Sequence, residues 1–391
     1  MVLESNQLVD IITQNVNTIV IVINQNGELI YISKSVERIL GYLPEELLGE
    51  YWWKATQKDH FSALDMIESI RNLVKLKEFD QEKLTSESML FDTAGNKKWI
   101  LWNSSKDENG NIVSVGYDIT SRKKNEAKLK KANLLLKAKN KEVLDSLKYA
   151  QSIQNAFLPS KTFFKEKFAN GFVFYQPKDF VSGDFYWTYE FEELYFVACI
   201  DCTGHGVPGA LMTILANSLL KSVVKHQKLK DPSEILFALD SLLYEEFNKN
   251  NKTKRSDGMD ISLCVFDFNK DSVLFSGANQ SLYYNSKKSK EIQEFKGKRY
   301  PIGLYHDVQK QFTTEKIEFQ KGDHFFMLSD GILDQFGGEK DKKFTKKRFM
   351  EGISKGQGNI SEIQYIAETE FINWKGIKEQ TDDVLVIGIE I

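Results

Sequence analysis

The sequence predicts an α+β chain of several domains, and three observations support this prediction. Its 391 residues are enough for two or three separate hydrophobic cores. Short apolar runs separated by turn residues occur in two blocks, residues 1–120 and 158–391, together with segments of helical periodicity. Residues 121–157 lie between the blocks, lack glycine and proline, and are good helix formers. We therefore expect an N-terminal domain, a helical connector and a C-terminal domain.

Composition and charge argue against several classes of protein. Hydrophobic residues at 41% and charged residues at 27% are ordinary for a soluble globular chain. A formal net charge of -3 does not suit a nucleic-acid binder. We find no signal peptide pattern at the N-terminus and no apolar run of about 20 residues to span a bilayer. Together with three cysteines, too few for a disulfide framework, this predicts a cytoplasmic protein without nucleic-acid or membrane partners.

The two closely spaced cysteines, Cys199 and Cys202, form a C-x-x-C pattern. A structural zinc site normally needs four ligands, and no second pair accompanies this one. Cys199 also lies inside an apolar strand-like run. We interpret both cysteines as packing and turn residues.

The N-terminal block, residues 1–120, reads as two strands, then helices, then three strands. Asn26-Gly27 between two apolar runs is a strong hairpin signal. The ordered motifs resemble those of the PAS family. They are Asn26-Gly27-Glu28 with Tyr31, Gly41-Tyr42, Glu45-Glu46-Leu47-Leu48-Gly49, Asp92-x-x-Gly95 with Trp99, and Gly116-Tyr117-Asp118-Ile119-Thr120.

The resemblance to PAS domains implies a five-stranded antiparallel sheet that binds a small ligand or cofactor, or that dimerises. This block has no cysteine, which argues against the flavin-adduct type of photosensor. The sequence leaves the PAS ligand unknown.

The connector, residues 121–157, shows an imperfect heptad pattern. Its apolar positions follow alternating steps of three and four residues, with Lys139 and Ser146 as polar interruptions. Two copies pairing in parallel through this seam would form a homodimer. We interpret the excess of basic residues as the solvated face of a coiled coil. The seam consists of Leu129, Ala132, Leu136, Val143, Ala150, Ile153 and Phe157.

Aspartates mark the ends of several apolar runs in the C-terminal block, residues 158–391. Asp184 follows Ser182-Gly183, and Asp201 ends the run Leu194–Ile200. Asp330-Gly331 follows a third run, and Asp382-Asp383 opens the last one. Carboxylates of this kind suit a binuclear Mg²⁺ or Mn²⁺ centre, and no histidine cluster points to zinc. A single aspartate at such a junction is ordinary turn chemistry, but the ordered set favours a site.

The same block resembles the metal-dependent (PPM) Ser/Thr protein phosphatases, and specifically their bacterial SpoIIE-like branch. The segment from Ser152 to Pro159 also looks like the regulatory helix of this branch. The matching motifs are Ser182-Gly183-Asp184-Phe185, Asp201-x-Thr203-Gly204-His205-Gly206-x-Pro208-Gly209-Ala210, Ser276-Gly277-Ala278-Asn279, Pro301-Ile302-Gly303, Ser329-Asp330-Gly331 and Thr381-Asp382-Asp383-Val384.

The resemblance implies an α/β/β/α sandwich that holds two Mn²⁺ or Mg²⁺ ions. Asp201 would bridge both ions and Asp184 would serve one of them, so that catalysis runs through a metal-activated water. The other implied ligands are Asp330, Asp382 and the backbone carbonyl of Cys202, with Asp383 as the alternative to Asp382. The sequence departs from the animal enzymes because it lacks a clear phosphate-binding arginine before the first motif and has Cys202 after Asp201.

The resulting hypothesis is a signal-regulated phosphatase that hydrolyses phosphoserine or phosphothreonine on a partner protein. The branch implies a STAS-type (anti-anti-sigma) phosphoprotein as substrate, and we expect the PAS input to act through helix packing around residues 145–158. One alternative is a catalytically inactive module that sequesters a partner, and the other is a nucleotide cyclase. The last strand, which begins with Thr381-Asp382-Asp383-Val384, does not suit the interpretation as a cyclase. We interpret His205 as a local hydrogen-bonding residue more readily than as an acid for the leaving group.

Overall fold

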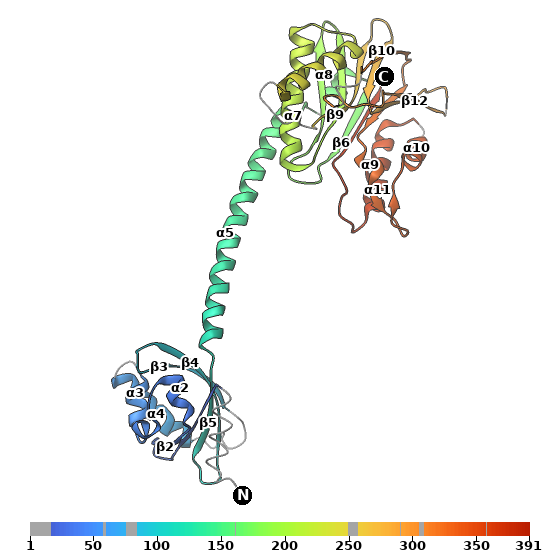
Figure 1. The fold of residues 1–391 in the computed structure, drawn as a ribbon. Helices are drawn as coiled ribbons and strands as arrows, with labels where there is room; N and C mark the ends of the chain where they lie inside the picture. The colour runs from blue at the N-terminus through green and yellow to red at the C-terminus, as the bar shows by residue number, and fades with distance from the viewer. Residues whose placement is uncertain are drawn as a thin grey trace. The chain divides into compact units, whose positions relative to one another are not determined.

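The computed structural model describes residues 17–57, 60–75, 84–160, 162–248, 257–289, 291–304, 309–356 and 358–391. By its internal contacts the chain divides into two compact units, residues 1–140 and 141–391. The division falls inside one long helix, α5, which Figure 1 shows in green. We retain residues 1–120, 121–157 and 158–391 as the proposed domain boundaries.

The N-terminal unit contains one antiparallel sheet in the strand order β2-β1-β5-β4-β3. Three tryptophans, Trp52, Trp53 and Trp102, are buried in its core, and Trp53 donates a hydrogen bond to the carbonyl of Gly27 in the predicted hairpin. The predicted PAS-like five-stranded sheet with helices is therefore confirmed. Its elements are β1 (Thr18–Ile23), β2 (Leu29–Ile32), α2 (Ser35–Leu40), η1 (Pro44–Leu47), α3 (Tyr51–Thr56), α4 (His60–Lys75), β3 (Leu84–Phe91), β4 (Lys97–Lys106) and β5 (Ile112–Asp118).

The predicted connector is a single helix, α5 (Thr120–Phe157). Its heptad side chains face solvent in the single chain, with Leu129 63%, Leu136 58% and Val143 56% exposed. A row of exposed apolar side chains of this length is typical of a helix that pairs with another helix.

The C-terminal unit contains two antiparallel five-stranded sheets. The first has the order β13-β10-β9-β8-β7 and the second the order β12-β11-β14-β17-β6. The strands are β6 (Asn170–Gln176), β7 (Asp184–Phe191), β8 (Leu194–Cys202), β9 (Met259–Asp267), β10 (Ser272–Ala278), β11 (Ser281–Asn285), β12 (Ile292–Lys296), β13 (Glu315–Glu318), β14 (His324–Leu328) and β17 (Val384–Glu390), with β15 (Phe336–Gly337) and β16 (Lys342–Lys343) forming a separate short hairpin.

Helices cover the outer face of each sheet. The first sheet packs against α7 and α8, and the second against α10 and α11 (Figure 1). The inner faces of the two sheets share a core rich in phenylalanine. The predicted α/β/β/α sandwich is confirmed. The helices of this unit are α6 (Phe163–Lys167), α7 (Gly206–Lys221), the π-helical turn η3 (Ser222–His226), α8 (Pro232–Asn248), α9 (Gly331–Asp334), α10 (Lys346–Lys355) and α11 (Ile360–Lys375).

The two cysteines of the C-x-x-C pattern point to opposite faces of β8. Cys199 lies in the core between the sheets, whereas Cys202 lies in the core beneath α7 and α8. Both thiols are free and buried. Their interpretation as packing residues is confirmed.

One helical stretch differs from the expectation about membrane-spanning segments. Within the described residues, Gly206–His226 is long and apolar enough to cross a bilayer by length and composition. More than half of it is buried inside the domain, where α7 packs on the first sheet. A core helix passes the same test of length and composition.

Candidate metal centre

Three aspartates form a row across neighbouring strands of the first sheet. The strand register places Asp184 of β7 opposite Asp201 of β8, and Asp201 opposite Asp260 of β9. Directly opposed residues in antiparallel strands have Cβ atoms about 5 Å apart. Asp260 was not predicted as a site residue. The only sequence signal for it was its place directly before the apolar run that begins at Ile261, two residues after Gly258.

The second sheet brings Asp330 and Asp382 to the same end of the sandwich. Asp330 follows β14 and Asp382 precedes β17, and these strands are antiparallel neighbours. Gly331 packs so closely on this strand start that a Cβ there would lie 1.9 Å from the carbonyl oxygen of Asp383. The structure thus places the ends of β14 and β17 in direct contact.

Ser329 links the two sheets at this point. Its Oγ donates a hydrogen bond to Asp184 Oδ2 at 2.5 Å and accepts one from the backbone N–H of Leu385 at 3.0 Å. Asp184 is almost fully buried at 2% exposure. The remaining carboxylates line an open hollow of about 430 Å³, namely Asp201, Asp260, Asp330, Asp382 and Asp383. The structure therefore brings together all the predicted acidic residues.

The two adjacent aspartates at the start of β17 play different parts. Asp383 is buried, and its two carboxylate oxygens accept hydrogen bonds from the backbone N–H groups of Lys178 and Gly183, each at 2.7 Å. Asp382 is exposed to the hollow, and one of its oxygens accepts the backbone N–H of Asp383 at 2.8 Å. This geometry favours Asp382 over Asp383 as a ligand.

Four aspartates of the site have raised pKa values, namely Asp184, Asp201, Asp260 and Asp330. Burial, together with the nearby charges of the other aspartates, raises the pKa values of Asp184 and Asp201 well above the ordinary value. Loss of contact with water also raises the pKa of Asp330, with Asp334 and Asp382 adding repulsion. Burial raises the pKa of Asp260 to about 6, although a hydrogen bond from Asn279 opposes this. Carboxylates are therefore concentrated at this end of the sandwich, close enough for their charges to repel one another.

The donor set fits a hard divalent cation. In the described part of the chain, no group of three or more His, Cys, Asp or Glu side chains is close enough together to hold a metal ion as it stands. The carboxylates nevertheless converge from two sheets, because Asp201 lies near enough to Asp184 and Asp330 for their negative charges to raise its pKa. Oxygen ligands of this type, open to water on one side, are what Mg²⁺ and Mn²⁺ prefer.

Glycines keep the turn around Asp201 compact. A Cβ on Gly183 would lie 3.0 Å from the carbonyl oxygen of Cys202 and 2.4 Å from that of Gly204. The side chain of Cys202 is buried in the core, so only its backbone carbonyl can serve the site. The cysteine side chain at position 202 therefore has no direct effect on the donor atoms.

Two polar residues stand at the rim of the hollow. His205 Nδ1 hydrogen-bonds Asp179 Oδ2 at 2.9 Å, in line with its interpretation as a local hydrogen-bonding residue. Arg299 is exposed and is the only Lys or Arg among the described residues that line the hollow. No motif pointed to Arg299, because its position depends on how the following loop folds back.

The backbone around Arg299 is fixed on both sides. Lys298 donates its N–H to the carbonyl of Gly277 at 2.8 Å, and its own carbonyl accepts the N–H of Asn279 at 2.7 Å. Ile302 exchanges two backbone hydrogen bonds with Met259, at 2.9 and 3.0 Å. These contacts hold the Arg299 segment against the first sheet, beside Asp260.

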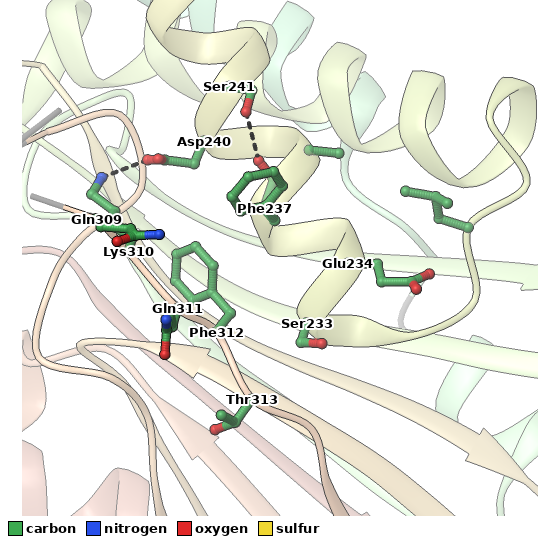
Figure 2. Close-up of a pocket in the computed structure, with 12 residues that line it drawn as sticks. Ser233, Glu234, Phe237, Asp240, Ser241, Gln309, Lys310, Gln311, Phe312 and Thr313 are labelled. Atoms are coloured by element: carbon green, nitrogen blue, oxygen red, sulfur yellow. Dashed lines mark hydrogen bonds and ion pairs between the residues drawn. The ribbon is translucent and has the colours of Figure 1, made fainter.

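A buried ion pair anchors the same segment from the other side. Figure 2 shows Asp240 of α8 paired with Lys310, whose Nζ lies 2.5 Å from Asp240 Oδ1. Asp240 also accepts the N–H of Gly303 at 2.7 Å, and Lys310 donates to the carbonyl of Pro301 at 2.8 Å. The hollow of about 830 Å³ in this view is separate from the carboxylate cluster, and its ion pair stabilises the loop that carries Arg299.

Fold and site together define a class of protein. The α/β/β/α sandwich, with acidic residues at one end of both sheets, is a PP2C-type domain. A PAS-like sheet and a long helix precede it. Residues 192–391, half of the chain, match the family model of Stage II sporulation protein E (SpoIIE), and residues 16–121 match a PAS domain model. The chain belongs to the SpoIIE family.

Three individual proteins are similar to parts of this chain. The phosphoserine phosphatase RsbU of Bacillus subtilis (strain 168) is 23% identical over 203 residues, which cover 51% of this chain and 56% of that protein. The chain thus matches little more than half the length of this curated relative. The solved SiaA-PP2C domain of Pseudomonas aeruginosa is 31% identical with a TM-score of 0.57, covering 64% of this chain and 98% of that domain. A structure of RsbX in complex with magnesium is 17% identical with a TM-score of 0.40, covering 56% of this chain and 92% of that one.

Proposed function

We propose that the protein is a signal-regulated, metal-dependent phosphatase that removes phosphate from phosphoserine or phosphothreonine on a partner protein. The observation that carries this proposal is the convergence of Asp184, Asp201, Asp330 and Asp382 at one end of both sheets of a PP2C-type sandwich. The presence of all four acidic residues argues against an inactive binding module.

In this proposal Asp201 would serve both cations and Asp184 one of them. Asp330, Asp382 and the backbone carbonyl of Cys202 would supply the remaining protein ligands. Mn²⁺ or Mg²⁺, when bound, supplies an acidified water for in-line attack and positive charge for the phosphoryl oxygens. Ser329 fixes the rotamer of Asp184 through its short hydrogen bond, and Asp383 fixes the turn before Asp184 by accepting the N–H of Gly183.

Arg299 takes the role of the phosphate-recognising cation. It stands at the mouth of an otherwise acidic hollow, on a backbone segment held at both ends. A guanidinium can donate two parallel hydrogen bonds to a phosphate, which a lysine ammonium cannot. We expect Arg299→Ala to raise KM for a phosphoprotein by about 10-fold or more, since a hydrogen bond to a charged group contributes about 1.5–3 kcal/mol. The neighbouring Lys298→Ala should leave KM unchanged, and equal effects of the two changes would contradict the role.

The comparisons bear on the class of substrate and partner. RsbU is described as a phosphoserine phosphatase, which supports a phosphoserine protein as the substrate here. A phosphorylated STAS-type regulator is the proposed substrate because the resemblance to the SpoIIE-like branch implies one. The exposed heptad seam of α5 supports a homodimer. A Leu136→Asp, Val143→Asp double variant should be monomeric by light scattering, whereas Lys141→Ala, off the seam, should remain dimeric.

The function is tested by release of phosphate from a phosphoserine protein. The full-length chain should be active with Mn²⁺ or Mg²⁺ and inactive with a chelator, and it should turn over neither ATP nor GTP. Metal binding without phosphate release from a panel of phosphoserine and phosphothreonine proteins would favour the inactive binding module. Nucleotide turnover with cyclic product would favour the cyclase.

A further inference from the structure

The end of the connector helix reaches the metal centre through one side chain. Within α5, Gln154 is the one buried residue, at 4% exposure. Its Nε2 donates to the carbonyl of Ser182 at 2.7 Å and to Thr213 Oγ1 at 3.1 Å. Its Oε1 accepts the N–H of Ser182 at 3.0 Å. The glutamine amide therefore pairs with both backbone groups of Ser182, as a neighbouring strand would.

Ser182 is two residues before Asp184 and is itself fully buried. Its Oγ accepts the backbone N–H of Asp184 at 3.0 Å. The next residue, Gly183, donates to Asp383 and accepts the N–H of Cys202 at 3.1 Å. The turn that presents Asp184 is thus held at three successive residues, and its first attachment point is the connector helix.

The predicted heptad seam continues past Gln154 to the end of the helix. Ile153 and Phe157 belong to the predicted heptad seam and are 39% and 42% exposed. A rotation of the helix that repacks this seam also moves Gln154. A rotation of about 20° at a side-chain radius of about 5–6 Å shifts an atom by about 2 Å, which exceeds the tolerance of a hydrogen bond.

We propose that Gln154 is a positioning residue that couples the connector helix to metal binding. When its three hydrogen bonds are made, the Ser182–Asp184 turn is fixed and Asp184 is presented to the cation. When the helix shifts and the bonds break, the turn relaxes and the affinity for metal falls. The inference rests on the proposed function because it concerns the same site, and it adds the residue through which regulation would act.

The test compares Gln154→Ala with Asn155→Ala in the full-length chain. Asn155 lies on the same turn of α5 but is exposed, so its replacement should change nothing. Gln154→Ala should raise the Kd for Mn²⁺ in calorimetry, and the Mn²⁺ concentration for half-maximal phosphate release, by about 10-fold, as changes in outer-shell partners do. At saturating Mn²⁺ its kcat should return to nearly the wild-type value. A purely structural role would lower kcat at every metal concentration and leave the Mn²⁺ dependence unchanged.

Hydrogen exchange in the metal-free protein gives a readout independent of activity. The amides of Ser182 and Asp184 should exchange faster in Gln154→Ala than in Asn155→Ala, while amides in β9 should not change. Thr213→Val removes one of the three bonds and should shift the Kd for Mn²⁺ in the same direction by a smaller factor, which keeps a test available if Gln154→Ala does not fold.

An unchanged Kd for Mn²⁺ and unchanged exchange in a folded Gln154→Ala variant would overturn the inference. If the wild-type chain binds Mn²⁺ but hydrolyses no phosphoprotein, the proposed function fails, whereas calorimetry and hydrogen exchange still decide the role of Gln154.

Discussion

Aspartates at strand ends behave differently in the two units of the chain. In the N-terminal unit, Asp92 is partly exposed and accepts hydrogen bonds from the backbone N–H groups of Ala94 and Asn96 in its own turn. Burial acts to raise the pKa of Asp92, but these hydrogen bonds outweigh it and lower that pKa. In the C-terminal unit, burial and like charges raise the pKa values of Asp184 and Asp201. The same residue type after a strand is a turn former in one unit and a candidate ligand in the other.

Burial alone does not explain the difference. Asp323, before β14, is only 1% exposed, yet it accepts hydrogen bonds from the Tyr284 hydroxyl and from the backbone N–H groups of Lys287 and Gln320. Burial acts to raise the pKa of Asp323, but its hydrogen bonds dominate and lower that pKa. Asp184, equally buried, has Ser329 as its neutral donor and other aspartates as neighbours. The comparison teaches that burial is common to both kinds of aspartate. A candidate metal ligand differs in having other carboxylates as neighbours and a raised pKa, whereas hydrogen-bond donors lower the pKa of a structural aspartate.

The largest effect is expected at the centre of the acidic cluster. Asp201→Asn removes the bridging carboxylate and should reduce phosphate release at least about 100-fold, because even changes behind the ligands cost 10–100-fold. The matched change Asp92→Asn should leave the specific activity unchanged. Both are measured as initial rates at saturating Mn²⁺. Equal activity of Asp201→Asn and wild type would show that the site is assigned wrongly.

A second expected effect is an unusual pH dependence of the metal-free protein. The folded state raises the pKa of Asp260 to about 6 from 3.8, so between these values the folded protein binds more protons than the unfolded one. The stabilisation contributed by Asp260 is therefore fully present at about pH 4 and below and is lost as the pH rises through 6, by up to about 3 kcal/mol. Thermal unfolding at pH 4.5, 6 and 7.5 in a chelator measures this loss, and Mn²⁺ should remove most of it. A metal-free protein that gains stability over this range would contradict the argument.

Replacing the structural aspartate Asp323 should lower stability and leave activity unchanged. Asp323→Ala leaves buried donors without an acceptor and should lower the free energy of unfolding by about 2 kcal/mol. The activity per folded molecule should be unchanged, because Asp323 lies at the start of β14 and the site lies beyond its end. Denaturant unfolding combined with rate measurement on the native protein tests this separation. A loss of metal affinity without a loss of stability would remove the distinction between the two kinds of buried aspartate.

Much of the fold was predictable because its signals are local. Alternating apolar residues and turns such as Asn26-Gly27 indicated the PAS-like sheet, and the stretch without glycine or proline matched α5 almost residue for residue. The short strand β12 and the helix α10 were not predicted. Both segments are short and rich in charged residues, so they adopt regular structure through packing against the rest of the domain.

The sequence by itself determined that aspartates end several apolar strands, that glycines follow or precede them, and that a helix without breaks joins two domains. These properties follow from steric and hydrogen-bonding preferences over a few residues. Only the tertiary structure decided that Asp383 fixes the backbone while Asp382 faces the hollow, that Asp260 and Arg299 join the site, and that Gln154 holds the turn before Asp184. Gly183 and Asp383 are hydrogen-bonded across 200 positions of sequence, and no local pattern encodes such a contact. The role of each carboxylate depends on which donors the packed sheets bring to it.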